Sequence, residues 1–216
     1  SNNFSSLGNI IYLQNKFILS ELYRDFPHYK TIIGSNGNEK RLTTPIFDQL
    51  DLFKENAIYD DSLCILGLIK NNRFYRYIPS KYIEQNENLN MYKVIIPKSN
   101  GTGALGETLS SPLIGKPLIG YTQSFIGIGA FDNYDEAKAA KKYIETKFAR
   151  AMLGILKVTQ DNNRDVWEYV PLQDFTKKSD IDWNQTINEI DRQLYAKYNL
   201  TNDEIAFIES MIKPME

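Results

Sequence analysis

Residues 120–155 read GYTQSFIGIGAFDNYDEAKAAKKYIETKFARAMLGI, and this stretch decides the fold class. The aromatic, β-branched and glycine residues of its first third predict a strand over 120–129. Asn133 and Glu136 have the spacing of a capping box, which marks the start of a helix. Apolar residues then recur every three or four positions over 137–155, which predicts one long amphipathic helix packed on the strand.

Three further strands are expected upstream of this unit. The runs Cys64–Ile69 and Arg73–Ile78 are separated by a short Asn-rich connection, which favours a hairpin. Tyr92–Pro97 is a third strand, ended by its proline. The order of elements predicts a mixed α/β (α+β) fold with a central, mostly antiparallel or mixed sheet, a long packed helix and a small C-terminal helical appendage.

The same patterns divide the chain into three parts. Apolar residues near helical spacing predict a helical lead-in over 1–30, and the α/β domain follows over 31–176. Two amphipathic helices, near 184–198 and 202–212, are expected to form an acidic appendage over 177–216.

Composition excludes several classes of protein. The chain has 216 residues, 42% of them hydrophobic, so it can bury a core and is not disordered throughout. A single Cys64 and a single His28 exclude an internal disulfide framework and a Cys/His zinc site. Neither a membrane-length apolar run nor a signal peptide is present, so we expect a cytoplasmic protein without a membrane partner. The Ser1-Asn2 start lacks an initiator Met, which suggests a piece of a longer protein.

The net charge of −2 conceals an uneven distribution along the chain. Residues 70–164 carry 14 basic and 8 acidic side chains, whereas residues 165–216 carry 5 and 11. Four of these eight acids lie within 101–137, where the only basic residue is a lysine, which leaves two basic blocks at 70–100 and 138–164. Two interpretations stay open: two solvated faces, or a basic surface that binds a polyanion.

Two glycine motifs suggest nucleotide or cofactor binding, and neither is complete. Residues 101–106 satisfy G-x-G-x-x-G after a strand, but a Ser- and Pro-containing segment follows in place of the required helix, which favours a polar loop. Residues 125–129 match the F-x-G-x-G element with which many methyltransferases hold S-adenosylmethionine. All prolines in the chain are isolated, so the Pro-Pro loop that would hold a target amine is absent, and glycines that permit close strand packing are the favoured interpretation.

The remaining candidates for catalysis have simpler explanations. Glu136 and Lys138 form an E-x-K pair of the kind found in nucleases, but they lie at a predicted helix start, where capping explains the acid. His28 has no companion His or Cys, and Cys64 begins an apolar run, so no Ser or Cys triad can be assembled. The residues therefore predict a binding domain rather than a catalytic one.

Three stretches taken together carry a resemblance to a known family. The chain resembles the C-terminal target-recognition (TaqI-like specificity) domain of adenine-specific DNA methyltransferases in type II restriction–modification systems. The matching stretches are Tyr92–Gly101, then Gly120–Phe125 with the helix 135–150, and lastly 159–175 with the tail 194–209. Their combination and order carry the resemblance over roughly 92–212, and residues 1–69 match less clearly.

In that family a separate N-terminal domain binds S-adenosylmethionine and methylates adenine N6, and the C-terminal domain clamps the duplex and reads the site. The resemblance implies that this chain is the DNA-reading part, with no cofactor and no catalysis of its own. Its implied partners are double-stranded DNA and the methyltransferase domain of the same polypeptide. The recognised sequence, the oligomeric state and any endonuclease activity of the parent enzyme stay open.

Recognition of DNA needs Lys and Arg for phosphates, and Asn, Gln, Arg and Thr for base edges. Such residues occur on the predicted hairpin, at the end of strand 92–97 with its following loop, and in strand 120–129. The candidate DNA-binding residues are Asn71, Asn72, Arg73, Arg76, Lys81, Lys93, Lys98, Ser99, Asn100, Thr102, Thr122 and Gln123. The acidic tail helices are expected to pack against the rest of the enzyme. The alternatives are a protein–protein interaction module and a small S-adenosylmethionine-dependent enzyme using residues 125–129.

Overall fold

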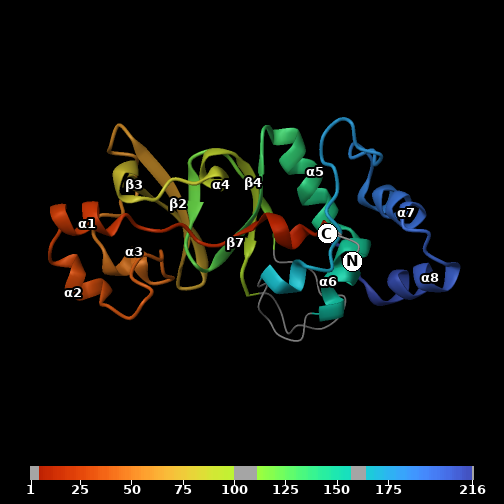
Figure 1. Cartoon of the computed structure of the whole chain (residues 1–216), viewed down its shortest axis with the longest axis horizontal. Helices are drawn as coiled ribbons and strands as arrows, with labels where there is room; N and C mark the ends of the chain where they lie inside the picture. Colours follow the sequence, from red (N-terminus) through yellow and green to blue (C-terminus); the bar gives the residue numbers. More distant parts are fainter. Residues whose placement is uncertain (1–4, 100–110, 157–163, 216) are drawn as a thin grey trace.

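The structure is a computed structural model that describes residues 5–99, 111–156 and 164–215. The molecule is elongated, with three short helices at one end, two β-sheets in the middle and a group of four helices at the other end (Figure 1). The mixed α/β class expected from the sequence is confirmed. The N-terminal and C-terminal segments both lie toward the four-helix end (Figure 1).

The bounds of the elements are as follows. The strands are β1 (Ile11–Tyr12), β2 (Ser62–Ile69), β3 (Asn72–Pro79), β4 (Tyr92–Pro97), β5 (Leu113–Gly115), β6 (Ile119–Tyr121) and β7 (Phe125–Phe131). The α-helices are α1 (Leu19–Asp25), α2 (Tyr29–Ile33), α3 (Ile46–Gln49), α4 (Glu87–Asn90), α5 (Tyr134–Glu145), α6 (Lys147–Leu156), α7 (Ile187–Lys197) and α8 (Asn202–Met211). The 3₁₀ helices are η1 (Leu7–Ile10), η2 (Ser80–Tyr82) and η3 (Arg164–Trp167).

The strands form two sheets rather than the single central sheet that the sequence suggested. A four-stranded antiparallel sheet has the order β1-β7-β4-β5, and a three-stranded sheet has the order β3-β2-β6 with β2 and β6 parallel. The predicted strand over 120–129 is two strands in different sheets, because the chain turns at 122–124 between β6 and β7. The three polar residues Thr122, Gln123 and Ser124 interrupt the apolar pattern at this turn, and they are the signal in the sequence for the division.

The predicted long helix over 137–155 is also divided, at Thr146, which has extended backbone angles between α5 and α6. The new helix start is capped twice. The Thr146 hydroxyl accepts a hydrogen bond from the Ala149 N–H at 3.1 Å, and the buried Asp191 carboxylate accepts from the N–H groups of Lys147 and Phe148 at 3.0 and 2.8 Å. These acceptors satisfy amide groups that a continuous helix would have paired internally.

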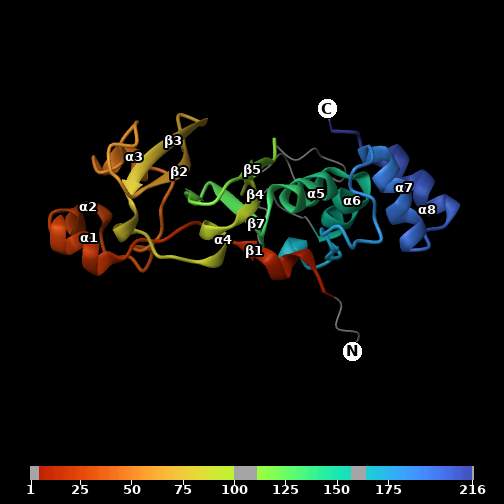
Figure 2. The same ribbon diagram turned by 90° about the horizontal axis from the view of Figure 1, so that it is seen from above.

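The largest core lies between the four-stranded sheet and the C-terminal helices. Helix α5 packs on β4, β5 and β7, and both α7 and α8 pack on α6 (Figure 2). The two tail helices predicted from the sequence are confirmed, and so is the capping box between Thr201 and Glu204 at the start of α8. Within this chain, the acidic tail therefore packs on the α5–α6 pair.

A second core fills the opposite end, where α1 to α3 and η2 pack around β2 and β3. The helical lead-in that the sequence predicted over 1–30 is not a single helix. Its first part forms η1 and the edge strand β1, which pairs with β7 through Ile11 and Tyr12, and only α1 and α2 are helical in the sense expected. The apolar residues of 7–12 have helical spacing, but pairing with β7 holds Ile11 and Tyr12 in a strand instead.

A small third cluster joins the two sheets. It consists of Leu66 from β2, Ile95 from β4, Tyr121 from β6 and Phe125 from β7, all fully or almost fully buried. This cluster fixes the hairpin of one sheet against the strand ends of the other.

Candidate nucleic-acid interface

The β2–β3 hairpin ends in a two-residue turn. Ile69 pairs with Asn72, so Lys70 and Asn71 form the connection, with φ values of 48° and 62°. Positive φ at both central positions is typical of the type I′ turn, which matches the twist of the flanking strands. The side chains of Lys70, Asn71 and Asn72 are exposed, and the Asn72 amide donates a hydrogen bond to the Lys70 carbonyl at 3.1 Å.

Arg73, which is next to Asn72 at the turn end of the hairpin, fastens the hairpin to the other sheet. Its guanidinium donates to the Ser111 carbonyl at 3.0 Å and lies 5.6 Å from the centroid of the Phe125 ring. Phe125 is buried in β7 and pairs with Pro97 of β4. Arg73 is therefore held near the ends of both inner strands of the four-stranded sheet.

Polar residues from three connections meet beside these strand ends. The Lys98 N–H donates to the Ser124 carbonyl at 2.9 Å, and the hydroxyls of Thr44 and Ser124 are 2.9 Å apart. Gln123 is held by its backbone N–H, which donates to the Leu42 carbonyl at 2.8 Å. These backbone contacts leave the side chains of Lys98 and Gln123 half-exposed.

The tertiary structure thus gathers six of the predicted residues, together with Lys70 and Ser124, at one side of the seam between the sheets. We call this group the seam surface, and it consists of Lys70, Asn71, Asn72, Arg73, Lys98, Ser99, Gln123 and Ser124. Within the described ranges, neither Lys70 nor Lys98 forms an ion pair. The predicted residues Asn100 and Thr102 lie outside the described residues.

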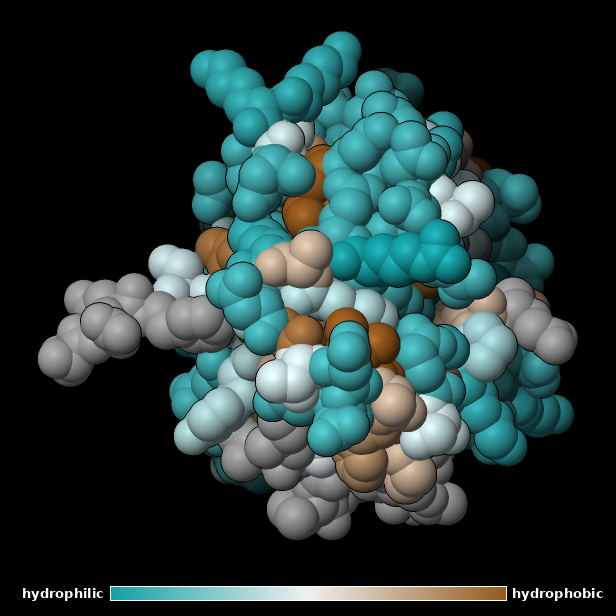
Figure 3. All heavy atoms as spheres, turned by 90° about the vertical axis from the view of Figure 1, so that its right-hand side faces the viewer, coloured by the Kyte–Doolittle hydropathy of each residue, from teal (hydrophilic) through white to brown (hydrophobic). Residues whose placement is uncertain are grey.

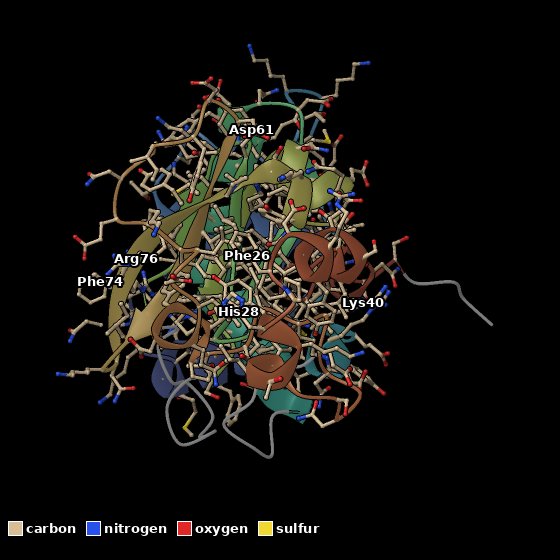
Figure 4. All side chains as sticks on the ribbon, turned by 90° about the vertical axis from the view of Figure 1, so that its left-hand side faces the viewer. Phe26, His28, Lys40, Asp61, Phe74 and Arg76 are labelled. Carbon is tan, nitrogen blue, oxygen red and sulfur yellow. The ribbon has the colours of Figure 1, made fainter. Side chains whose placement is uncertain are left out.

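Two predicted cations lie away from the seam surface and face carboxylates. Arg76 forms an ion pair with Glu55 at 3.3 Å and lies over the Phe74 ring, and Figure 4 shows Arg76 and Phe74 together at one edge of the molecule. Lys81 lies in η2, past the far end of β3, and forms an ion pair with Asp25 at 2.6 Å. A cation already paired with a carboxylate offers less to a phosphate.

Lys93, one of the predicted DNA-binding residues, does not lie at the surface where the prediction placed it. Its side chain is 0% exposed, and its ammonium donates to the carbonyls of Leu89, Lys116 and Ile119 at 3.0 to 3.2 Å. Burial lowers the pKa of Lys93 to about 7. The stem lies over Gly115, where a Cβ would be 2.6 Å from the Lys93 Cδ, so this lysine is a structural tie inside the molecule.

Thr122 is a second correction, because its side chain is also 0% exposed. Its methyl group packs near Gly67 of β2, and its backbone N–H donates to the Leu66 carbonyl at 2.9 Å. Thr122 directly follows β6 between the two sheets, so its hydroxyl does not reach the surface.

The second basic block, 138–164, is largely engaged by contacts within the chain. Lys141 pairs with Glu145, Lys142 donates to the carbonyls of Trp183 and Gln185, and Lys147 pairs with Glu209 of α8. Arg150 is buried, and desolvation lowers its pKa. The block therefore holds the tail in place, and among its described members only Lys138 is an exposed cation without a contact of this kind.

The F-x-G-x-G stretch forms β7, with β1 on one side and β4 on the other. A Cβ at Gly127 would lie 2.1 Å from the Tyr121 hydroxyl oxygen. A Cβ at Gly129, which has φ +79°, would lie 2.2 Å from the Phe131 ring. The space that these glycines leave is filled by the protein's own aromatic side chains, as the strand interpretation requires.

His28 and Cys64, which the sequence analysis did not assign to a catalytic triad, occupy ordinary surface and partly buried positions. His28 is exposed, with its ring 4.6 Å from that of Tyr29 (Figure 4), and Cys64 is half-buried in β2, where desolvation raises the pKa of its thiol. No cluster of His, Cys, Asp and Glu suited to a metal ion occurs among the described residues. Over the same parts of the chain, no helix has the length and apolarity needed to cross a membrane.

Sequence reasoning missed Lys70, Thr44 and Ser124 as members or supports of this surface. Lys70 belongs to the same connection as Asn71, so the hairpin prediction contained the signal for it. Nothing in the sequence joins Thr44 to Ser124, which are 80 positions apart and meet only through the fold.

Comparisons with known proteins add no relative to this description. The chain matches no protein-family model, no curated protein and no solved structure.

Proposed function

We propose that this chain recognises a specific sequence in double-stranded DNA, as the specificity domain of a restriction–modification adenine N6 methyltransferase. Catalysis and S-adenosylmethionine binding belong, in this proposal, to a methyltransferase domain of the same polypeptide. The sequence resemblance suggests the family, and the arrangement of the seam surface supports the activity.

The observation that carries the proposal is where the fold places the cations of the basic block 70–100. Of the basic block 70–100, Arg76 and Lys81 face carboxylates and Lys93 is buried, whereas Lys70, Arg73 and Lys98 lie on the seam surface. Amide and hydroxyl side chains lie among those three, and such a mixture serves phosphate contact and base contact together. A face that only contacts solvent has no requirement for cations, amides and hydroxyls to lie together at the seam between the sheets.

The test is selection of a randomised DNA duplex pool with this chain at about 50 mM salt, where phosphate contacts are strong. We expect retention and enrichment of one short sequence. Because three cations contribute, the slope of log K against log salt should be about −2.7, at ~0.9 for each phosphate neutralised. Failure to retain any duplex would overturn the proposal, and binding that does not change with salt would contradict this interface.

A matched pair of variants locates the interface. Lys98→Gln should weaken duplex binding and make the salt slope shallower by about 0.9. Lys138→Gln removes the same charge from the exposed face of α5, away from the seam surface, and should leave both quantities unchanged. Equal effects from the two variants would indicate binding by net charge rather than by the seam surface.

A protein–protein interaction module is a second candidate, favoured by one observation at the opposite end of the molecule. An apolar pocket of about 650 Å³ lies between α6 and α8, with the exposed Phe207 on its wall and Asp203 and Glu204 on its rim. Figure 3 looks at this end, where apolar patches interrupt a hydrophilic surface. The acidic rim fits a partner segment with basic residues around an apolar anchor.

This second candidate predicts that Phe207→Asp abolishes binding of the partner while duplex binding stays unchanged. The matched control is Ala206→Asp, which adds the same charge at the neighbouring exposed position of α8. Binding of partner by both variants would contradict the pocket as the docking site.

A further inference from the structure

The far part of the β2–β3 hairpin is a two-stranded ribbon. Strand β2 pairs with β6 only over Cys64–Leu66, and beyond that point it pairs with β3 alone, from Gly67 to the turn. The sheet therefore narrows from three strands to two. Two strands about 4.8 Å apart fit the major groove of B-DNA, which is about 12 Å wide.

The ribbon is supported on both faces, at Gly67 and at Arg73, which pairs with Leu68. On one face, the space above Gly67 is filled by the Phe47 ring, which would lie 2.5 Å from a Cβ at this position. On the other face, Arg73 is held by the Phe125 ring and the Ser111 carbonyl. Rigid support below and exposed polar side chains above are what a recognition element requires.

The turn contains a residue that the backbone does not favour. Type I′ turns favour Asn, Asp or Gly at the first central position because φ is positive there. This chain has Lys70 at that position, with φ 48°, and Asn71 at the second, with φ 62°. Left-handed backbone at a residue other than Gly, Asn or Asp is costly and is typical of functional sites.

We infer that the hairpin tip enters the major groove, where Lys70 binds a phosphate and the Asn71 amide contacts a base edge. The inference rests on the proposed function and assigns roles within it. The strained Lys70 supplies a cation at the very tip, and an Asn amide can donate and accept at once, which suits the N6 and N7 positions of adenine. An A-form RNA duplex has too narrow a major groove for a ribbon, so the ligand is DNA.

Two variants change the side chains and keep the turn. Lys70→Asn installs a residue that the turn favours, so the thermal midpoint should rise by about 2 to 4 °C. The same variant should bind every duplex more weakly, with a salt slope shallower by about 0.9. A residue that only shapes the turn would not give this combination, in which the thermal midpoint rises while duplex binding weakens.

Asn71→Gly also suits the turn, because glycine adopts positive φ without strain. It should retain duplex binding but lose discrimination at one base pair, by about fivefold or more in the selected pool. The control Lys177→Asn makes the Lys70→Asn change in an exposed loop after Phe175 and should alter neither binding nor specificity.

The outcomes separate the inference from the proposed function. If the unmodified chain retains no duplex, the proposed function and the inference fail together. If the chain retains and enriches DNA but both turn variants select the same sequence with the same salt slope, the hairpin inference is overturned and the function stands. Equal retention of an RNA duplex of the enriched sequence would also overturn the major-groove inference.

Discussion

The Arg73 guanidinium lies 5.6 Å from the centroid of the Phe125 ring, and this contact links the two sheets of the molecule. Arg73 belongs to β3 in the three-stranded sheet, and Phe125 begins β7 in the four-stranded one. The contact places the hairpin beside the end of β4, where Lys98 lies. One cation–π pair thus orients the parts of the seam surface relative to each other.

Arg73→Lys should therefore lower stability although the charge is kept, because an ammonium cannot stack as a plane while donating to the Ser111 carbonyl. We expect a loss of about 1 kcal/mol in the free energy of unfolding. A double-mutant cycle with Phe125→Leu, measured by chemical denaturation, should give a coupling energy of about 0.5 to 1 kcal/mol. Arg192→Lys, at an exposed ion pair with Glu189, is the control and should change stability by less than about 0.5 kcal/mol. Zero coupling between Arg73 and Phe125 would contradict a link through this pair.

Lys93 should give the protein a stability that rises with pH. Its pKa is about 7 in the folded state, below the ordinary value of 10.5, so between these values the unfolded chain binds one more proton than the folded one. Stability should then increase with pH across this window by up to about 1.4 kcal/mol per pH unit, and the cost of burying the cation is fully present below pH 7. Denaturation of the protein and of Lys93→Met at pH 7 and pH 9 isolates the effect. An identical pH dependence in the two proteins would mean that Lys93 stays charged throughout.

Asp191 should matter more to stability than other acids of the tail. Burial raises the pKa of its carboxyl, which nevertheless accepts the amide hydrogens of Lys147 and Phe148 at the start of α6. Asp191→Ala leaves those amides without an acceptor and should cost about 2 kcal/mol in the free energy of unfolding. Asp180→Ala, which removes an exposed partner of Lys197, should cost less than about 1 kcal/mol. Equal losses from the two variants would argue against the capping role.

Gly127→Ala should be among the costliest small changes in the chain. The added methyl group would lie 2.1 Å from the hydroxyl oxygen of Tyr121, which is 0% exposed and donates to Asn88 at 2.7 Å. We expect a loss of about 3 kcal/mol from overpacking. Tyr121→Phe removes the clashing atom, so the double variant should lose at least about 1 kcal/mol less than the sum of the single variants. Strict additivity in thermal or chemical denaturation would show that the strand has room for the methyl group.

Several features of this protein follow from the sequence alone, because local interactions determine them. The β2–β3 hairpin, strand β4, the Asn133 cap of α5 and the Thr201–Glu204 capping box were all predictable, since each depends on residues close together in the chain. The mixed fold class follows from the order of these elements.

Tertiary structure decided the rest, because contacts between distant segments override local patterns. Asp191 and Thr146 divide the predicted long helix, although its apolar spacing runs on without a break. Lys93 looked like a surface cation and is buried, because β4 is an inner strand and the carbonyls of Leu89, Lys116 and Ile119 accept hydrogen bonds from its ammonium. Sequence determined which residue types were available for the proposed interface, and only the fold decided which of them reach the surface together, since exposure depends on contacts with residues that are distant in the sequence.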